Sequence, residues 1–153
     1  MAKARGIQII VLGDQSVGKT SIINMYVDNK FGDEHVASLG LDFATKKYKV
    51  KSTSEEINIK IWDTAGQERF KTMTQNFFRK SDGILICFDM NNKKTFDNVC
   101  VWVETLNKFC EKETPKVVIG NKVDIAKDRQ VTYEEAMSFA RSLGFTYFET
   151  SAL

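Results

Sequence analysis

A glycine-rich run from Gly13 to Thr20 has the residue types and spacing of a loop that binds nucleotide phosphates. Gly13 and Gly18 allow the backbone to curl so that successive N–H groups face an anion, and the positive end of the following helix adds to that field. Lys19 can reach the β- and γ-phosphates, and Thr20 offers a hydroxyl to their Mg²⁺. The alternative is an ordinary turn that contains glycines and an exposed lysine, but the complete pattern of residues 13–20 rarely arises by chance in such a turn. We expect nucleotide contacts from Asp14, Gln15, Ser16, Val17, Gly18, Lys19, Thr20 and Ser21.

An Asn-Lys-Val-Asp segment at residues 121–124 indicates which base is bound. It follows an apolar run and so falls at the carboxyl end of an expected strand, where open α/β sheets bind ligands. A carboxylate at Asp124 can accept from both the N1–H and the 2-amino group of guanine, and rejects adenine by as much as ~10⁴-fold because adenine lacks that donor pair. Asn121 is expected to tie this loop to the phosphate loop, and Lys122 to cover the base. Alone the segment is an ordinary polar turn; beside the phosphate loop it favours guanine.

A third segment, residues 63–67, has the residues that hydrolysis of a γ-phosphate needs. Asp63 can hold a water on Mg²⁺, the backbone N–H of Gly66 can approach the phosphate, and Gln67 can orient the attacking water. An Asp-x-x-Gly turn is common by itself, but its place after an alternating strand pattern favours hydrolysis. We predict Gln67, Lys19 and Gly66 as the catalytic residues.

These segments need a sheet to bring them together, and the remaining pattern predicts one. Apolar runs at 7–12, 84–88, 117–119 and 145–148 are typical of buried strands, and helical patterns separate them. Alternation on both sides of the polar turn at 52–56 predicts an antiparallel hairpin. We therefore predict an α/β domain of the P-loop NTPase type: a mostly parallel six-stranded sheet with one antiparallel edge strand and helices on both faces.

Local signals set the expected helix ends. Tyr26 is predicted on the apolar face of the first helix, and Pro115 is predicted to stop the helix whose apolar positions begin at residue 96. Thr132 and Glu135 predict a capping box for the next helix, and Gly144 marks its end.

Composition agrees with one domain in a reducing compartment. The chain has 153 residues, enough to bury a core. Its three cysteines lie in apolar contexts without metal-ligand spacing, and we expect buried free thiols in the cytosol. A net charge of +2 gives no case for a nucleic-acid surface, and no secretory signal or long apolar span is present.

Taken together, these motifs resemble the small GTPases of the Ras superfamily, and within it the Rab branch. Residues 38–43 resemble the Rab T-I-G-V-D-F segment, residues 71–83 the Rab stretch R-T-I-T-x-x-Y-Y-R-x-A-x-G, and residues 149–152 the E-T-S-A guanine lid. The resemblance covers essentially the whole chain. It implies a small G domain that binds Mg²⁺ with GTP or GDP, hydrolyses GTP slowly unless stimulated, and regulates vesicle traffic.

The resemblance also implies roles for particular residues. Ser38 would complete a Mg²⁺ set with Thr20 and Asp63, and Phe31 would pack edge-on against the guanine. The lid residues Ser151, Ala152 and Leu153 would meet the base, Ala152 through its backbone N–H. An exchange factor, an activating protein and effectors are the implied partners, with effectors meeting Phe43, Trp62 and Phe77. Core packing remains the alternative role for Phe31 and Phe43.

Some features depart from the Rab pattern. Ser38 stands where threonine is usual, and Leu153 where lysine is usual. The family's last helix and prenylated tail have no counterpart, so we expect residues 1–153 to form a G domain without that helix, and no membrane anchor in this chain. An engineered truncation, part of a longer or tandem protein, and a naturally short member all remain open. We expect a cytosolic protein, placed on the cytosolic face of endomembranes only in a longer prenylated form.

Two functions remain after these observations. A GTP-hydrolysing switch is favoured by Gln67. A nucleotide-binding interaction module with negligible turnover is the alternative, favoured by Ser38 and by the missing helix.

Overall fold

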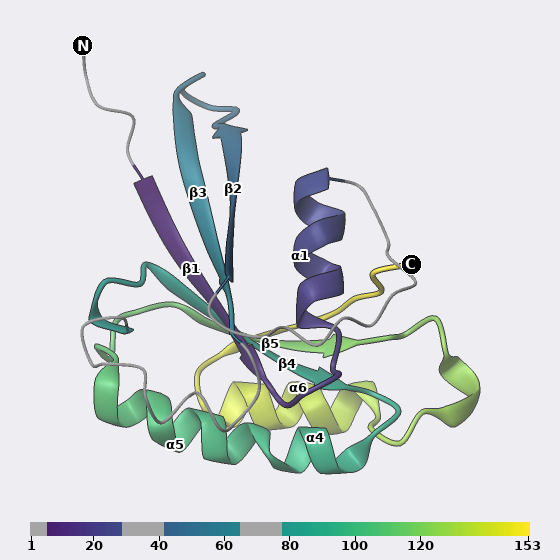
Figure 1. The fold of residues 1–153 in the computed structure, drawn as a ribbon. Coiled ribbons are helices and arrows are strands. Elements are labelled where there is room, and N and C mark those ends of the chain that lie inside the picture. The colour runs from purple at the N-terminus through teal and green to yellow at the C-terminus, as the bar shows by residue number, and fades with distance from the viewer. Residues whose placement is uncertain (1–5, 29–41, 65–77) are drawn as a thin grey trace.

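The computed structural model describes residues 6–28, 42–64 and 78–153, which form a six-stranded sheet with helices (Figure 1). The strand order is β2-β3-β1-β4-β5-β6. β2 pairs antiparallel with β3, and every other neighbouring pair is parallel, which confirms the predicted mixed sheet with an antiparallel edge strand. The strands are β1 (Gly6–Gly13), β2 (Asp42–Lys49), β3 (Glu56–Asp63), β4 (Gly83–Asp89), β5 (Lys116–Asn121) and β6 (Thr146–Glu149).

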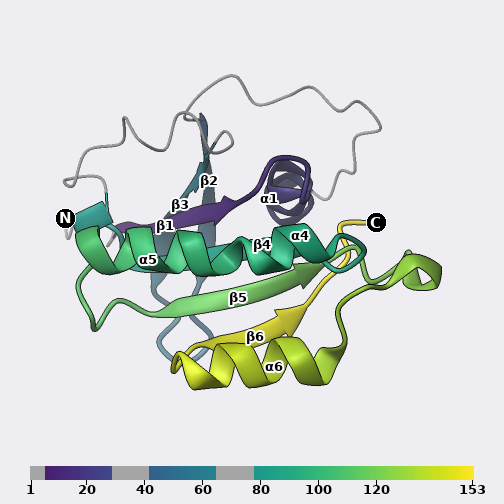
Figure 2. The same cartoon turned by 90° about the horizontal axis from the view of Figure 1, so that it is seen from below.

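Helices cover both faces of the sheet, as predicted. α1 (Lys19–Asp28) lies on one face, while α4 (Lys93–Asp97), α5 (Val99–Phe109) and α6 (Tyr133–Ser142) lie on the other (Figures 1 and 2). A short 3-10 helix, η1 (Ala126–Asp128), follows β5. No helix in the described ranges combines the length and apolarity that a membrane crossing requires.

The strand register brings the carboxyl ends of the parallel strands to one edge. Across β1 and β4, Gly13 pairs with Cys87, and across β4 and β5, Asp89 pairs with Asn121. On the other side of β1, Val11 pairs with the last residue of β3. The segments that follow these strands therefore start beside one another, which is the arrangement that a ligand site at the edge of an α/β sheet needs.

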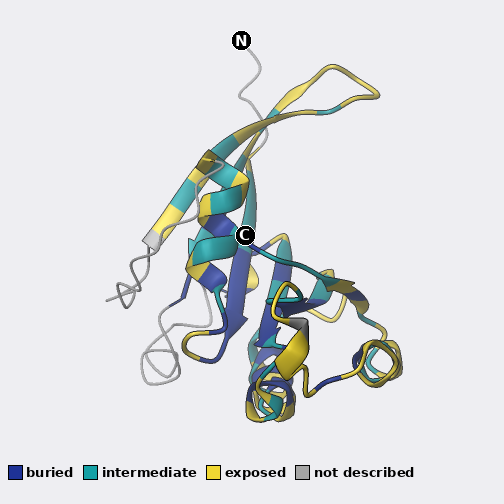
Figure 3. Ribbon diagram, turned by 90° about the vertical axis from the view of Figure 1, so that its right-hand side faces the viewer, coloured by how far each residue is buried: buried dark blue, intermediate teal, exposed yellow. Residues whose placement is uncertain are grey.

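Two apolar clusters fill the space between sheet and helices. Successive side chains of a strand point to opposite faces, so Ile10 and Leu12 join the larger cluster with α5 and α6, whereas Val11 joins the smaller one with Ile23 of α1. Figure 3 shows buried residues gathered in the strands between the helices and exposed residues at the far end of the β2–β3 hairpin.

The second of the two helices after β4, α5, ends earlier than the proline predicts. α5 stops at Phe109, Cys110 is extended, and Thr114 donates its N–H to the carbonyl of Glu111 in a turn. Proline sets only the last residue that a helix can reach. Here the chain needs a turn before β5, and the carbonyl of Pro115 accepts from the N–H of Ile84 at the start of the sheet pairing.

The cap of α6 has half of the predicted box. The Thr132 hydroxyl oxygen accepts from the Glu135 N–H at 3.1 Å, while the Glu135 carboxylate contacts Lys93 of α4. Gly144 follows this helix with φ of +73°, as a terminal glycine should.

Two predictions of burial are wrong. Tyr26 is exposed, because its ring lies against the ammonium of Lys46 in β2 and not in the apolar cluster that Ile23 joins. All three cysteines are free, but only Cys87 is buried, while Cys100 is exposed on the outer side of α5 and Cys110 is half-buried. Burial raises the pKa of the Cys87 thiol to about 12.

Candidate functional site

The phosphate loop between β1 and α1 is packed so tightly that two glycines are required. A Cβ at Gly13, where φ is +142°, would lie 2.2 Å from the carbonyl oxygen of Cys87 in β4. A Cβ at Gly18, where φ is +96°, would lie 2.3 Å from Nδ2 of Asn121, the last residue of β5. The loop backbone is therefore seated directly on its neighbours, which orients its N–H groups.

Lys19 lies beneath this loop and is buried. Its ammonium donates to the carbonyl oxygens of Gly13 at 2.9 Å and Asp14 at 2.7 Å. Burial lowers the pKa of Lys19, and the nearby negative charge of Asp63 works in the opposite direction. A phosphate at the loop would favour the charged ammonium, so the arrangement is suited to an anionic ligand.

A hydroxyl and a carboxylate meet beside Lys19. Thr20, in the first turn of α1, donates from Oγ1 to Oδ2 of Asp63 at the end of β3. The next residue, Thr64, donates to the carbonyl of Val11 at 2.8 Å and holds the end of β3 against β1. Oxygen donors of this kind are the ligands that Mg²⁺ prefers, so Thr20 and Asp63 fit a magnesium site.

Asn121 links residues 121–124, which are predicted to bind the base and are called the base-binding segment below, to the phosphate loop and to the segment after β6. Its Nδ2 donates to the carbonyl of Val17 at 2.9 Å, and its Oδ1 accepts from the hydroxyl of Thr150 at 3.1 Å. The side chain is almost completely buried. The amide thus uses both ends, as a buried amide must, and fixes three chain segments together.

The neighbouring residues of the motif continue these contacts. Lys122 donates from Nζ to the carbonyl of Ser16 at 2.8 Å. Asp124 accepts from the Ser151 hydroxyl at 2.6 Å, and Ser151 in turn accepts from the Leu153 N–H at 3.1 Å. The base-binding segment and the predicted lid are therefore adjacent.

Backbone bonds hold that lid in place. Thr150 donates its N–H to the carbonyl of Gly120 at 2.8 Å, and its own carbonyl accepts from Val123. Ala152 is buried and Leu153 is exposed. Asp124 is exposed, and its carboxylate lies beside the predicted lid.

Comparison with known proteins gives the family. The model of the Ras family matches residues 8–153. The chain belongs to the Ras family of small GTPases. Such proteins bind guanine nucleotides and hydrolyse GTP.

Similar relatives are Rab proteins. Ras-related protein Rab-21 of Mus musculus is 38% identical over 150 residues, which cover 98% of this chain and 67% of the relative. RabC of Dictyostelium discoideum is 37% identical over 145 residues, covering 95% and 74%, and Rab-1 of Theileria parva is 38% identical over 146 residues, covering 95% and 66%. The chain thus spans about two thirds of the length of Rab-21, at 67% in mouse and 66% in human.

Several predicted site residues of this GTPase lie outside the described residues. They are Phe31, Ser38, Gly66, Gln67 and Phe77, and their roles stay predictions. Of the predicted effector residues, Phe43 and Trp62 are described: their rings lie 5.1 Å apart on the β2–β3 hairpin, and Nζ of Lys60 lies 4.0 Å and 4.6 Å from the two centroids. Phe43 is 53% exposed, which argues against core packing.

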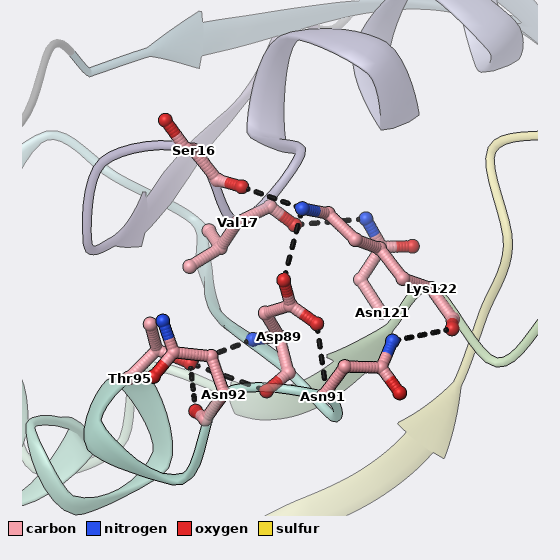
Figure 4. Close-up of polar contacts among 8 residues, drawn as sticks. All are labelled: Ser16, Val17, Asp89, Asn91, Asn92, Thr95, Asn121 and Lys122. Carbon is pink, nitrogen blue, oxygen red and sulfur yellow. Dashed lines mark hydrogen bonds and ion pairs between the residues drawn. The ribbon is translucent and has the colours of Figure 1, made fainter. Parts of the chain in front are cut away.

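Sequence reasoning missed residues that support the two loops from a distance. Asp14 of the phosphate loop accepts from Asn98 at 2.5 Å and from the indole N–H of Trp102 at 3.0 Å, both at or in α5. Asp89, at the end of β4, forms an ion pair with Lys122 at 2.9 Å (Figure 4). The available signal for Asp89 was its place directly after a buried strand, the place that Asn121 also has.

Proposed function

We propose that this Ras-family GTPase is a Rab-type molecular switch that binds GTP or GDP with Mg²⁺, hydrolyses GTP and regulates vesicle traffic. The observation that carries the proposal is the bond from Asn121 to the carbonyl of Val17, because it joins a guanine-type motif to a phosphate-binding loop. The similarity to Rab proteins supports the traffic role.

Base choice rests on Asp124. Its carboxylate would accept from the two guanine donors while Ser151 continues to donate to it. Lys122 would cover the base with its stem, and the lid residues Ser151, Ala152 and Leu153 would close the other side, with the Ala152 N–H meeting the guanine O6. Phe31 would pack against the base edge.

Phosphate binding rests on Lys19 and the loop around it. Lys19 would transfer its hydrogen bonds from the loop carbonyls to phosphate oxygens, and the N–H groups of residues 14–21 would add theirs. Thr20 would ligate Mg²⁺ directly, Asp63 would act through a water, and Ser38 would join when a γ-phosphate is present. The bound ion offsets charge that develops on the phosphates.

Hydrolysis and switching rest on the segments around Ser38 and Gln67. Gln67 would orient the attacking water, and the Gly66 N–H would meet the γ-phosphate. The order of these segments would depend on the γ-phosphate, so hydrolysis would release them from effectors bound at Phe43, Trp62 and Phe77. An exchange factor and an activating protein would set the cycle, at the cytosolic face of endomembranes if the complete protein carries a prenylated tail.

Single-turnover hydrolysis of GTP, with and without a Rab-activating protein, tests this proposal. We expect slow intrinsic turnover that an arginine supplied by the activating protein raises by ~10³–10⁵. Gln67→Leu should keep nucleotide affinity and lose most stimulated turnover. A wild-type protein that binds GTP but hydrolyses it no faster than Gln67→Leu would instead favour an interaction module with negligible turnover, the function that Ser38 in place of threonine favours.

A further inference from the structure

Asp89 lies between the two nucleotide-binding loops without belonging to either. It ends β4 and pairs in register with Asn121, so it stands at the same edge of the sheet as the base-binding segment. Its Oδ2 lies 2.9 Å from Nζ of Lys122, and its Oδ1 accepts from the N–H of Asn91 at 2.9 Å (Figure 4). The side chain of Asp89 is only 14% exposed and that of Lys122 27%. Water therefore screens this ion pair less than it screens a pair on the surface.

Lys122 has a backbone conformation that needs such support. Its φ is +67°, in the left-handed region, which costs a residue with a side chain ~1–3 kcal/mol unless its surroundings hold it. Contacts to its backbone and to its side chain hold Lys122 in this conformation. Asn91 Nδ2 donates to the Lys122 carbonyl at 3.2 Å. The Lys122 ammonium contacts the Asp89 carboxylate and the carbonyl of Ser16.

The turn that carries Asp89 is itself fixed. The N–H of Asp89 donates to the Thr95 hydroxyl at 2.9 Å, and that hydroxyl donates to the carbonyl of Asn92 at 2.8 Å (Figure 4). Met90 donates to the carbonyl of Asn121 at 3.1 Å. These bonds fix the position of Asp89, and its carboxylate in turn restrains the long side chain of Lys122.

We infer that Asp89 is a positioning residue for the guanine-nucleotide site: together with Asn91 it holds Lys122 in the conformation that covers the base and bridges to the phosphate loop. The inference rests on the proposed function. Without the carboxylate, the Ser16 carbonyl is the one fixed partner that the described residues leave to the ammonium, and the lysine stem is free to leave the base. Nucleotide should then dissociate faster while associating at an unchanged rate, because the loop that it first meets is intact.

The test is a double-mutant cycle on the dissociation of mant-GDP, followed after addition of excess GDP with Mg²⁺ present. We expect Asp89→Ala to raise the dissociation rate roughly ten-fold, within the range of coupling between contacting residues. In a Lys122→Gln background, the same substitution should change the rate less than two-fold, a non-additivity that a general loss of stability would not produce. Asp97→Ala, which removes an exposed carboxylate of α4 at a weak contact with Lys93, is the matched control and should leave the rate unchanged.

The outcomes separate this inference from the proposed function. Wild-type protein that does not bind mant-GDP contradicts the proposed function. Wild-type protein that binds mant-GDP, with Asp89→Ala dissociating at the wild-type rate or adding its full effect to Lys122→Gln, contradicts the inference alone. Should Asp89→Ala not fold, the cycle is run with Asp89→Asn, which keeps an oxygen for the Asn91 N–H and removes only the charge, and the same two results decide.

Discussion

At the scale of single residues, Asn121 and Gly18 show how closely the two loops are fitted. The amide of Asn121 reaches the carbonyl of Val17 because the residue next to Val17 has no side chain. An added Cβ at Gly18 would collide with the amide nitrogen at 2.3 Å. The contact between the loops therefore depends on the absence of a side chain at Gly18 as much as on the hydrogen bond from Asn121.

Gly18→Ala should break this contact. We expect weaker GDP binding, by ~10²-fold, and a loss of ~1–3 kcal/mol in the free energy of unfolding, since the new methyl group displaces a buried amide and φ is strained. Isothermal titration with GDP and urea unfolding measure the two effects. Gly6→Ala is the control, because a Cβ there meets no atom of the described residues within 4 Å. Equal behaviour of the two variants would show that the loops are not packed as described.

Asp124→Asn should change base preference. The new amide can still accept from Ser151, but it presents a donor where guanine has one, and xanthine offers an oxygen there instead. We expect weaker binding of GDP and tighter binding of xanthosine diphosphate, compared by competition with a fluorescent nucleotide. Asp128→Asn, in the nearby η1, should retain the wild-type preference. An unchanged preference of Asp124→Asn for guanine over xanthine would show that the Asp124 carboxylate does not contact the base.

Lys19 should give the stability a defined pH dependence. Burial lowers its pKa in the folded protein below the ordinary 10.5, so between the lowered pKa and 10.5 the unfolded chain binds more protons. Stability relative to a Lys19→Met variant should therefore rise with pH across that window and be flat below it. Urea unfolding of both nucleotide-free proteins over alkaline pH measures the difference. A difference that falls with rising pH would contradict the burial of a charged lysine.

At the scale of elements, α5 supports the phosphate loop from the far side of the sheet. Asn98 and Trp102 both donate to the carboxylate of Asp14, and Trp102 is buried in the larger core cluster. The helix that packs the core thus also positions the loop that is proposed to bind phosphate. Its outer side, with exposed Cys100 and Val101, is on the surface.

Trp102→Phe tests this link, because phenylalanine keeps an aromatic ring in the core but lacks the indole N–H, together with part of the indole ring system. We expect a loss of ~1–3 kcal/mol in the free energy of unfolding, since a buried carboxylate loses a donor. The matched variant is Trp62→Phe, whose N–H donates to Gln8 at 3.2 Å at a less buried place and should cost less than ~1 kcal/mol. If urea unfolding showed equal losses of unfolding free energy in the two variants, the bond from Trp102 to Asp14 would contribute no more to stability than the bond from Trp62 to Gln8.

The elements also show what sequence patterns can predict. The hairpin, the parallel strands and the Thr132 cap follow from local signals of alternation and capping. The end of α5 does not, because the turn before Pro115 is set by where β5 joins β4. In the site, each of the three motifs is a continuous stretch of the chain, so the sequence alone predicts it. The bonds from Asn91 to Lys122, and from Asn98 and Trp102 to Asp14, join residues 31, 84 and 88 positions apart, and only the fold reveals them.

At the scale of the whole molecule, the parallel register gathers the functional segments at one edge. β1 leads into the phosphate loop, β3 ends at Asp63, β4 at Asp89 and β5 at Asn121, while β6 leads into the lid. Helices on both faces hold these strands (Figures 1 and 2). A ligand at this edge would contact many segments at once, so its binding should stabilise the entire fold.

Nucleotide and metal should therefore act on global stability together. At a GDP concentration 100 times its dissociation constant, the free energy of unfolding should rise by about 2.7 kcal/mol. Removing Mg²⁺ with EDTA should lower the thermal midpoint of the GDP-bound protein toward that of the nucleotide-free protein, because Thr20 and Asp63 would lose their ion. Differential scanning calorimetry measures both shifts. A thermal midpoint indifferent to EDTA would contradict the magnesium role.

We propose that one edge of this sheet binds guanine nucleotides through the joined phosphate loop and base-binding segment. Displacement of mant-GDP by unlabelled GDP and by ATP, with Mg²⁺ in excess, tests it most directly. We predict that GDP displaces the probe at a concentration up to ~10⁴-fold below that required of ATP, because Asp124 has no donor pair to accept from in adenine. Displacement by ATP at the same concentration as GDP would contradict the claim.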